Sequence, residues 1–204
     1  MLAQKGGTGK TTLCLHLAVL AAEQGRSAAV VDIDPQASAS AWHRRRQQST
    51  PVVLRCNATD LPARLETLEQ QDHQLALVDT APHSSHEAAA AAALADLVLI
   101  VTRPAILDLE AIGASVRIAR DQGCRAAVVL NACPPPHRWG EPAIVREARE
   151  ALGVYRLPVS PVAISQRAAF SHALIDGRAV TEFEDHGKAA GEIRNLWNWI
   201  ESLD

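Results

Sequence analysis

The chain has 204 residues, of which 48% are hydrophobic and only 3% aromatic, and its formal net charge is −3. The apolar content excludes a disordered chain, and the slightly negative charge excludes a basic field over the whole protein. No apolar run reaches transmembrane length, and the apolar stretch after residue 10 lacks the basic flank of a signal peptide. We therefore expect a cytoplasmic protein with one domain over residues 1–204.

Short apolar runs alternate along the chain with stretches of helical pattern. Runs typical of buried strands are 28–33, 51–56, 75–80, 97–102 and 126–132. Helical patterns cover about 10–24, 37–48, 60–71, 85–95, 107–122, 142–152, 164–175 and 187–203. This alternation predicts an α/β fold, a mostly parallel twisted sheet with helices on both faces. The proline-rich segment 133–142 is expected to be a loop.

The strongest signal is the segment KGGTGKTT at residues 5–12. Its glycines let the backbone turn its N–H groups toward phosphate oxygens, and the apolar helix that follows attracts anions to its amino end. In such a loop Lys10 reaches the β- and γ-phosphates, and the Thr11 hydroxyl binds Mg²⁺. The expected nucleotide-binding residues of the loop are Gly6, Gly7, Thr8, Gly9, Lys10, Thr11 and Thr12. The alternative is a glycine-rich turn without a ligand.

The lysines of the chain are concentrated in this loop. Only three of the 20 basic residues are lysines, and two of them are Lys5 and Lys10. Nearly all basic residues outside the loop are arginines, which suggests that the loop needs the compact ammonium group of lysine. The usual P-loop pattern has glycine where Gln4 stands here. With Lys5 next in line, the pattern Lys-Gly-Gly-x-Gly-Lys-Thr-Thr is the deviant Walker A motif.

Two of the apolar runs end in aspartates. Asp32 and Asp34 end the run at 28–33, and their i, i+2 spacing places both on one face of an extended segment. Asp79 ends the run at 75–80. Because Mg²⁺ takes one or two carboxylates and keeps several waters, such acids after a phosphate loop fit a magnesium site. The alternatives are turn and cap chemistry for the pair and an ordinary strand end for Asp79.

These motifs in this order resemble the ParA/MinD family of P-loop ATPases, and the length suggests its small ParA type. The resemblance implies a Mg²⁺-dependent ATPase of weak basal activity that dimerises around ATP. It implies that Lys5 crosses the dimer interface to the partner's nucleotide, that Asp34 orients the attacking water and that Asp32 contacts the water shell of Mg²⁺. The implied catalytic residues are therefore Lys5, Lys10 and Asp34, and the implied metal site consists of Thr11, Asp32 and Asp79.

The resemblance also implies an adenine contact and a set of partners. Asn131 ends a later strand, where members of the family often read the adenine; an ordinary turn residue is the alternative. The family positions cargo, such as a plasmid, a chromosome region or a protein microcompartment, with an adaptor of ParB type. Nonspecific DNA binding and nucleoid association rest on the resemblance alone. The basic run 43–48 could bind DNA phosphates or be a solvated helix face.

Three other functions compete with this interpretation. A MinD-like membrane switch would need a basic amphipathic helix at the carboxyl end, whereas residues 193–204 end acidic, so we expect no stable membrane association. A metabolic P-loop enzyme that activates a small substrate with ATP is the second alternative. The third is a module that holds nucleotide without turnover.

The amino end departs from the expected pattern. A P-loop connects a central strand to a helix, and such a strand needs about five or six residues. Only residues 1–4 precede the loop. We therefore expect the first strand to be truncated to a weakly paired stub, or its beginning to lie upstream.

Overall fold

The structure, a computed structural model, describes residues 1–3, 5–82, 84–136 and 140–203, so Gln4 lies outside it. The strands are β1 (Ala28–Asp32), β2 (Val52–Arg55), β3 (Leu75–Asp79), β4 (Leu97–Thr102) and β5 (Arg125–Leu130). The helices are α1 (Lys10–Glu23), α2 (Ser38–His43), α3 (Leu61–Gln70), α4 (Ser85–Ala93), α5 (Ile106–Asp121), α6 (Ala143–Leu152), α7 (Ala168–Ile175), α8 (Val180–Phe183) and α9 (Lys188–Glu201), with a 3₁₀ turn at Gly153–Tyr155. Every predicted strand is confirmed.

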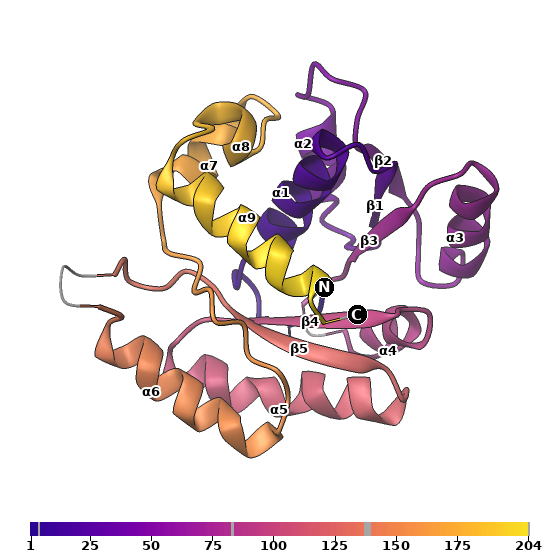
Figure 1. Cartoon of the computed structure of the whole chain (residues 1–204). Coiled ribbons are helices and arrows are strands. Elements are labelled where there is room, and N and C mark those ends of the chain that lie inside the picture. Colours follow the sequence, from indigo (N-terminus) through magenta and orange to yellow (C-terminus); the bar gives the residue numbers. More distant parts are fainter. Residues whose placement is uncertain (4, 83, 137–139, 204) are drawn as a thin grey trace.

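The strands run parallel but form two groups. β1 lies between β2 and β3, and β4 pairs with β5. Asp32 stands opposite Asp79 in the register of β1 and β3, so both acids lie at the carboxyl edge of their strands. Figure 1 shows the amino end of the chain between the two groups.

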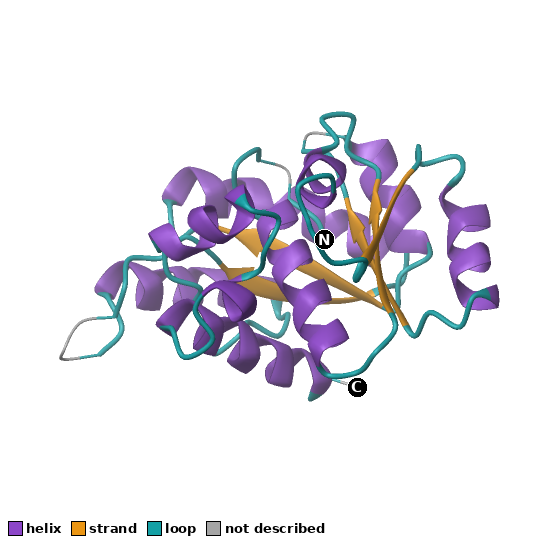
Figure 2. Cartoon of the chain, turned by 90° about the horizontal axis from the view of Figure 1, so that it is seen from above, coloured by secondary structure: helices purple, strands orange, loops and turns teal. Residues whose placement is uncertain are grey.

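Helices cover both faces of β4 and β5, with α9 on one side and α5 and α6 on the other in Figure 1. Figure 2 shows the strands and helices from above. On one face, Leu99 and Val101 pack with Leu17 of α1 and Ile193 of α9. On the other face, their strand neighbours pack against α4, α5 and α6. Because successive side chains of a strand point to opposite faces, a strand covered on both sides must be apolar throughout. The predicted fold class, a parallel α/β sheet between helices, is thereby confirmed.

The amino end occupies the gap between the two groups as a stub. The Met1 ammonium donates to the Val78 carbonyl oxygen of β3 at 2.7 Å. The Leu2 N–H donates to the Leu99 carbonyl oxygen of β4 at 2.9 Å, and the Val101 N–H donates to the Leu2 carbonyl oxygen at 2.9 Å. Leu2 forms one parallel bridge with Ile100 rather than a strand, as predicted.

Two predicted helix boundaries were wrong. α2 ends at His43 rather than near residue 48, because the Arg46 guanidinium turns away to bind the Glu182 carboxylate at 2.7 Å, with its side chain only 2% exposed. α7 begins at residue 168 rather than 164, because the Ile164 N–H donates to the Leu130 carbonyl oxygen and keeps this segment extended. The short α8 was not predicted. Among the described helices, none is both long and apolar enough to cross a membrane.

Candidate functional site

The glycine loop leads directly into α1, as predicted. Gly9 has φ 91° and Gly7 has φ 72°, a region that side chains other than glycine rarely adopt. A Cβ on Gly9 would also lie 2.1 Å from Nδ2 of Asn131. The backbone thus reaches the first turn of α1 by a path that requires glycine, and it leaves the N–H groups of this turn free of a side-chain cap. Free N–H groups at a helix start form an anion site.

Two side chains from the neighbouring strands hold the loop in place. Nδ2 of Asn131, just after β5, donates to the Thr8 carbonyl oxygen at 2.6 Å. Nη2 of Arg103, just after β4, donates to the Gly7 carbonyl oxygen. The role predicted for Asn131, contact with the adenine, stays a prediction; what the structure adds is its role as a brace of the loop. Arg103 was missed by sequence reasoning, although its position directly after a strand was the available signal.

Lys10 lies inside the site, with 6% of its surface exposed. Burial lowers the pKa of its ammonium group, while the Asp79 and Asp34 carboxylates raise it. The predicted lysine and two of the predicted acids are therefore brought together. Thr12, the remaining loop residue, is half-buried on the first turn of α1.

Asp79 is the most unusual group of the site. It is fully buried, and neither of its carboxylate oxygens has a hydrogen-bond partner among the described residues. Burial raises its pKa to about 6; the Thr11 hydroxyl and the Met1 ammonium lie near enough to offset only part of this. A buried carboxylate without partners is costly. A hydrated Mg²⁺ would give the Asp79 carboxylate the hydrogen bonds that it lacks. Asp79 and Thr11 are therefore suitable ligands for the Mg²⁺ that the motifs predict.

The acid pair shapes the loop between β1 and α2. The Asp32 carboxylate accepts hydrogen bonds from Ser40 N–H at 2.9 Å and from the Ser40 hydroxyl at 2.8 Å, so it caps the first turn of α2. It also accepts the Asp34 N–H at 3.2 Å. The Asp34 carboxylate accepts the Gln36 N–H at 2.9 Å through one oxygen. Turn and cap chemistry is thus present, and the metal and water roles of the pair stay predictions.

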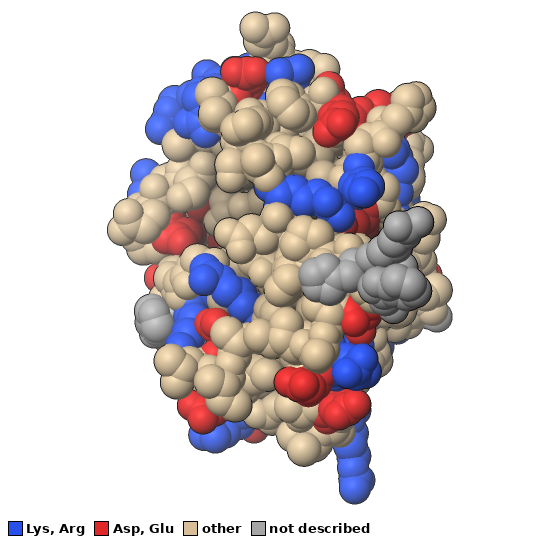
Figure 3. All heavy atoms as spheres, turned by 90° about the vertical axis from the view of Figure 1, so that its left-hand side faces the viewer, with Lys and Arg blue, Asp and Glu red and all other residues tan. Residues whose placement is uncertain are grey.

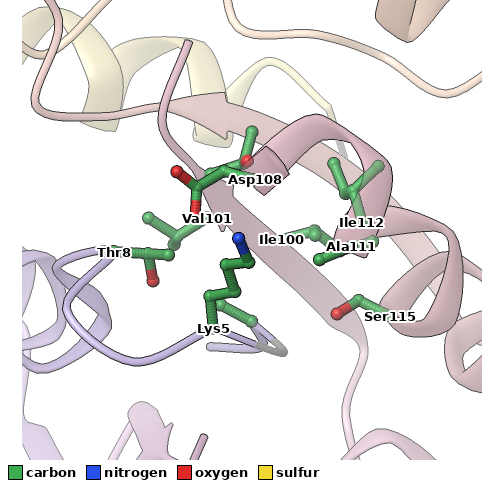
Figure 4. A pocket seen from close by; sticks show the side chains of 10 residues that line it. Lys5, Thr8, Ile100, Val101, Asp108, Ala111, Ile112 and Ser115 are labelled. Carbon is green, nitrogen blue, oxygen red and sulfur yellow. The ribbon is translucent and has the colours of Figure 1, made fainter. Parts of the chain in front are cut away.

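The half-buried side chain of Lys5 lies beside α5. In Figure 4 its side chain points toward the carboxylate of Asp108, in the first turn of that helix. A small cavity of about 10 Å³ beside it is lined by Thr8, Ile112 and Ser115 among others. Within one molecule Lys5 therefore points toward an acid of α5, whereas the carboxylates of Asp34 and Asp79 act on Lys10.

This arrangement defines a nucleotide-binding protein of the P-loop class. The loop supplies N–H groups and a buried lysine for phosphates, and the strand ends supply carboxylates on the same side. The described residues contain no group of three or more His, Cys, Asp or Glu that could hold a metal alone.

Comparison with known proteins identifies the family. Residues 1–180 match the CobQ/CobB/MinD/ParA nucleotide binding domain, and the chain belongs to this family. It is 30% identical to "Maintenance of carboxysome distribution protein A" of Halothiobacillus neapolitanus, over 96% of this chain and 92% of that protein. It is 33% identical to the protein of the same name from Gloeobacter kilaueensis, over 98% and 90%. The fold matches a McdA variant from Cyanothece in complex with ATP, with TM-score 0.80 and 15% identity over 99% and 94% of the chains.

Proposed function

We propose that this chain is a Mg²⁺-dependent ATPase that pairs with a second copy around ATP and positions a cargo. The observation that carries the proposal is the buried, unpartnered carboxylate of Asp79 beside Lys10 and Thr11 in the glycine loop. Bound Mg²⁺ would neutralise charge on the phosphates during transfer to water. Lys10 would hold the phosphates, Thr11 and Asp79 the hydrated metal, and Asp34 the attacking water. Weak basal hydrolysis is expected.

An apolar surface next to Lys5 supports the pairing. Ile106 and Leu107, which begin α5, are 69% and 61% exposed, and Asp108 follows them directly. Exposed large apolar side chains in one patch beside a functional site are typical of a surface that another molecule covers. In the proposed pair, Lys5 reaches the nucleotide of the partner, while this patch becomes buried.

The proposed cargo is a protein microcompartment, because the two relatives above are named for carboxysome distribution and match this chain over nearly their whole length. A plasmid or a chromosome region is the alternative cargo. In either case we propose that an adaptor of ParB type sits on the cargo. We also propose that the ATPase binds DNA without sequence preference and is therefore associated with the nucleoid.

The charges of the described residues bear on the DNA surface. Figure 3 shows Lys and Arg in separate groups interspersed with acids on one face. The basic run 43–48 contributes less than its sequence suggests, since Arg46 is buried against Glu182. The apolar face of α9 packs into the core through Ile193, Leu196 and Trp197. Membrane attachment through this last helix is therefore not favoured.

Nucleotide binding tests the proposal most directly. Lys10→Ala should abolish binding of a fluorescent ATP analogue in the presence of Mg²⁺, because the charge that faces the phosphates is lost. Lys188→Ala is the matched control, since Lys188 is the remaining lysine of the chain and is exposed on α9. An unchanged affinity in Lys10→Ala would contradict the assignment of the loop. The proposed DNA binding is tested separately: the protein should be retained on nonspecific DNA with ATP but not with ADP.

A further inference from the structure

Arg103 lies where the end of β4 meets the glycine loop. It directly follows Thr102, the last residue of β4, which is itself paired with β5. The Thr102 carbonyl oxygen accepts the Asn131 N–H at 2.8 Å, so the backbone at the ends of both strands is fixed. Thr8 of the loop and Val101 of β4 line the same small cavity, as Figure 4 shows. The side chain at position 103 is therefore attached to a rigid point beside the loop.

The guanidinium of Arg103 is held by the loop itself. Among the residues that the structure describes, it contacts one acceptor, the Gly7 carbonyl oxygen, to which Nη2 donates. Its Nε is buried and has no hydrogen-bond partner among these residues. A Cβ on Gly7 would lie 2.7 Å from Nη2, so the guanidinium occupies space that a larger residue at position 7 would fill. The contact with Gly7 therefore determines where this cation lies.

The carbonyl oxygens of the loop determine where its N–H groups point. In a planar trans peptide unit, the C=O of one residue and the N–H of the next point in opposite directions. Arg103 binds the carbonyl oxygen of Gly7, so the Thr8 N–H points away from the guanidinium. Asn131 binds the carbonyl oxygen of Thr8 at 2.6 Å, which directs the Gly9 N–H in the same way. The two braces thus fix the orientation of two consecutive N–H groups.

This orientation matters most before a nucleotide binds. N–H groups that converge on one anion repel one another when no anion is bound, because their positive ends face one another. A loop rich in glycine can relieve the repulsion by rotating its peptide units at little steric cost. Donors on the outer side of the loop hold the carbonyl oxygens and oppose that rotation. Phosphate binding then needs less reorganisation of the loop, which raises the affinity.

We propose that Arg103 is a positioning residue for phosphate binding, which acts by holding the Gly7 carbonyl oxygen. This role rests on the proposed function, since it belongs to the same nucleotide site. The guanidinium bonds to the carbonyl side of the peptide unit, opposite the N–H of Thr8, so it orients the loop rather than binding the phosphates. Loss of one hydrogen bond from a charged donor should weaken ATP binding about tenfold to a hundredfold.

Arg103→Ala tests the proposal, with Arg117→Ala as the matched control, since Arg117 is exposed on α5. With Mg²⁺ present, Arg103→Ala should bind a fluorescent ATP analogue at least about tenfold more weakly than the parent chain, and the control should bind it equally well. The affinity for inorganic triphosphate, measured by competition, should fall by the same factor, because the loop binds the phosphates. Millimolar guanidinium chloride should restore part of the affinity of Arg103→Ala. Tetramethylammonium chloride should not, because it carries a charge without N–H donors.

The outcomes separate this role from the proposed function. Equal ATP affinities for Arg103→Ala and the parent would overturn the role of Arg103 alone, whereas a parent chain that binds no ATP would overturn both. An unchanged affinity for inorganic triphosphate would show that Arg103 acts on another part of the nucleotide. Equal rescue by the two cations would show that charge alone suffices. A nucleotide-free melting temperature of Arg103→Ala more than about 5 °C below that of the parent would show that the residue serves the stability of the fold instead.

Discussion

Replacing Asp79 with asparagine should change how the stability of the nucleotide-free protein depends on pH, and it should damage the activity. The carboxylate is fully buried, lacks hydrogen-bond partners among the described residues and has its pKa raised from 3.8 to about 6 by burial. A folded-state pKa above the unfolded value means that the folded protein binds the proton more tightly. The contribution of Asp79 to stability is therefore most favourable at low pH and is lost as the pH rises through 6.

The size of the effect follows from the shift. A pKa difference of about two corresponds to roughly 3 kcal/mol between the two protonation states, which is an upper limit for the destabilisation by ionised Asp79 at pH 7.5. The asparagine amide adds N–H donors that need partners, at a cost of about 1–3 kcal/mol. This cost is independent of pH. Between pH 4.5 and 7.5, the difference in unfolding free energy between Asp79→Asn and the parent should thus change by about 2 kcal/mol in favour of the variant.

Urea unfolding of both proteins across this pH range measures the difference directly. Groups that do not interact with Asp79 contribute equally to both proteins and cancel. Mg-ATP should raise the melting temperature of the parent more than that of the variant, and ATP hydrolysis by the variant should fall at least about tenfold. A stability difference between the two proteins that stays constant with pH would refute the reasoning, because burial would then not destabilise the ionised carboxylate of Asp79.

Three further variants test other parts of the site. Asp34→Ala should bind ATP and accumulate as a dimer on size-exclusion, because only the carboxylate that orients water is lost; turnover at the parent rate would exclude that role. Lys5→Ala should keep much of its ATP binding but fail to dimerise, and normal dimerisation with ATP would contradict the assignment of Lys5. His16 is buried, accepts the Val180 N–H at 3.2 Å and has its pKa lowered by burial to about 3. Its contribution to stability should be present above pH 6.5 and be lost at up to about 1.4 kcal/mol per pH unit below it, and His16→Asn should flatten this loss in acid unfolding curves.

The sequence predicted those features that depend on local pattern. Apolar runs bounded by turns placed all the strands, since a strand buried on both faces must be apolar throughout. The sequence placed Asp32 and Asp79 at the ends of strands, and the register of β1 and β3 brings them opposite each other. The glycine spacing predicted the loop, because φ above zero at Gly7 and Gly9 is a local requirement.

Contacts between distant segments could not be predicted in this way. Arg46 is separated by 136 residues from Glu182, and no local pattern distinguishes it from Arg44 or Arg45. Because Arg46 is buried, α2 ends early and the basic run 43–48 exposes less positive charge than its sequence suggests. The brace from Arg103 to the loop spans 96 residues. Such pairs depend on which elements the folded chain brings together, and a single sequence does not display that.

The division of the sheet has a consequence for catalysis. Asp34 follows β1 and Asp79 ends β3, whereas the braces of the loop, Arg103 and Asn131, follow β4 and β5. The amino-terminal stub joins the two groups through a few hydrogen bonds, to Val78 on one side and to β4 on the other. Helix α1 joins them as well, because its Leu17 packs in one apolar cluster with Leu77 of β3 and Leu99 of β4. Catalysis requires the carboxylates and the phosphates at fixed distances, so the contacts that join the two groups of strands also position the reacting groups when Mg-ATP binds.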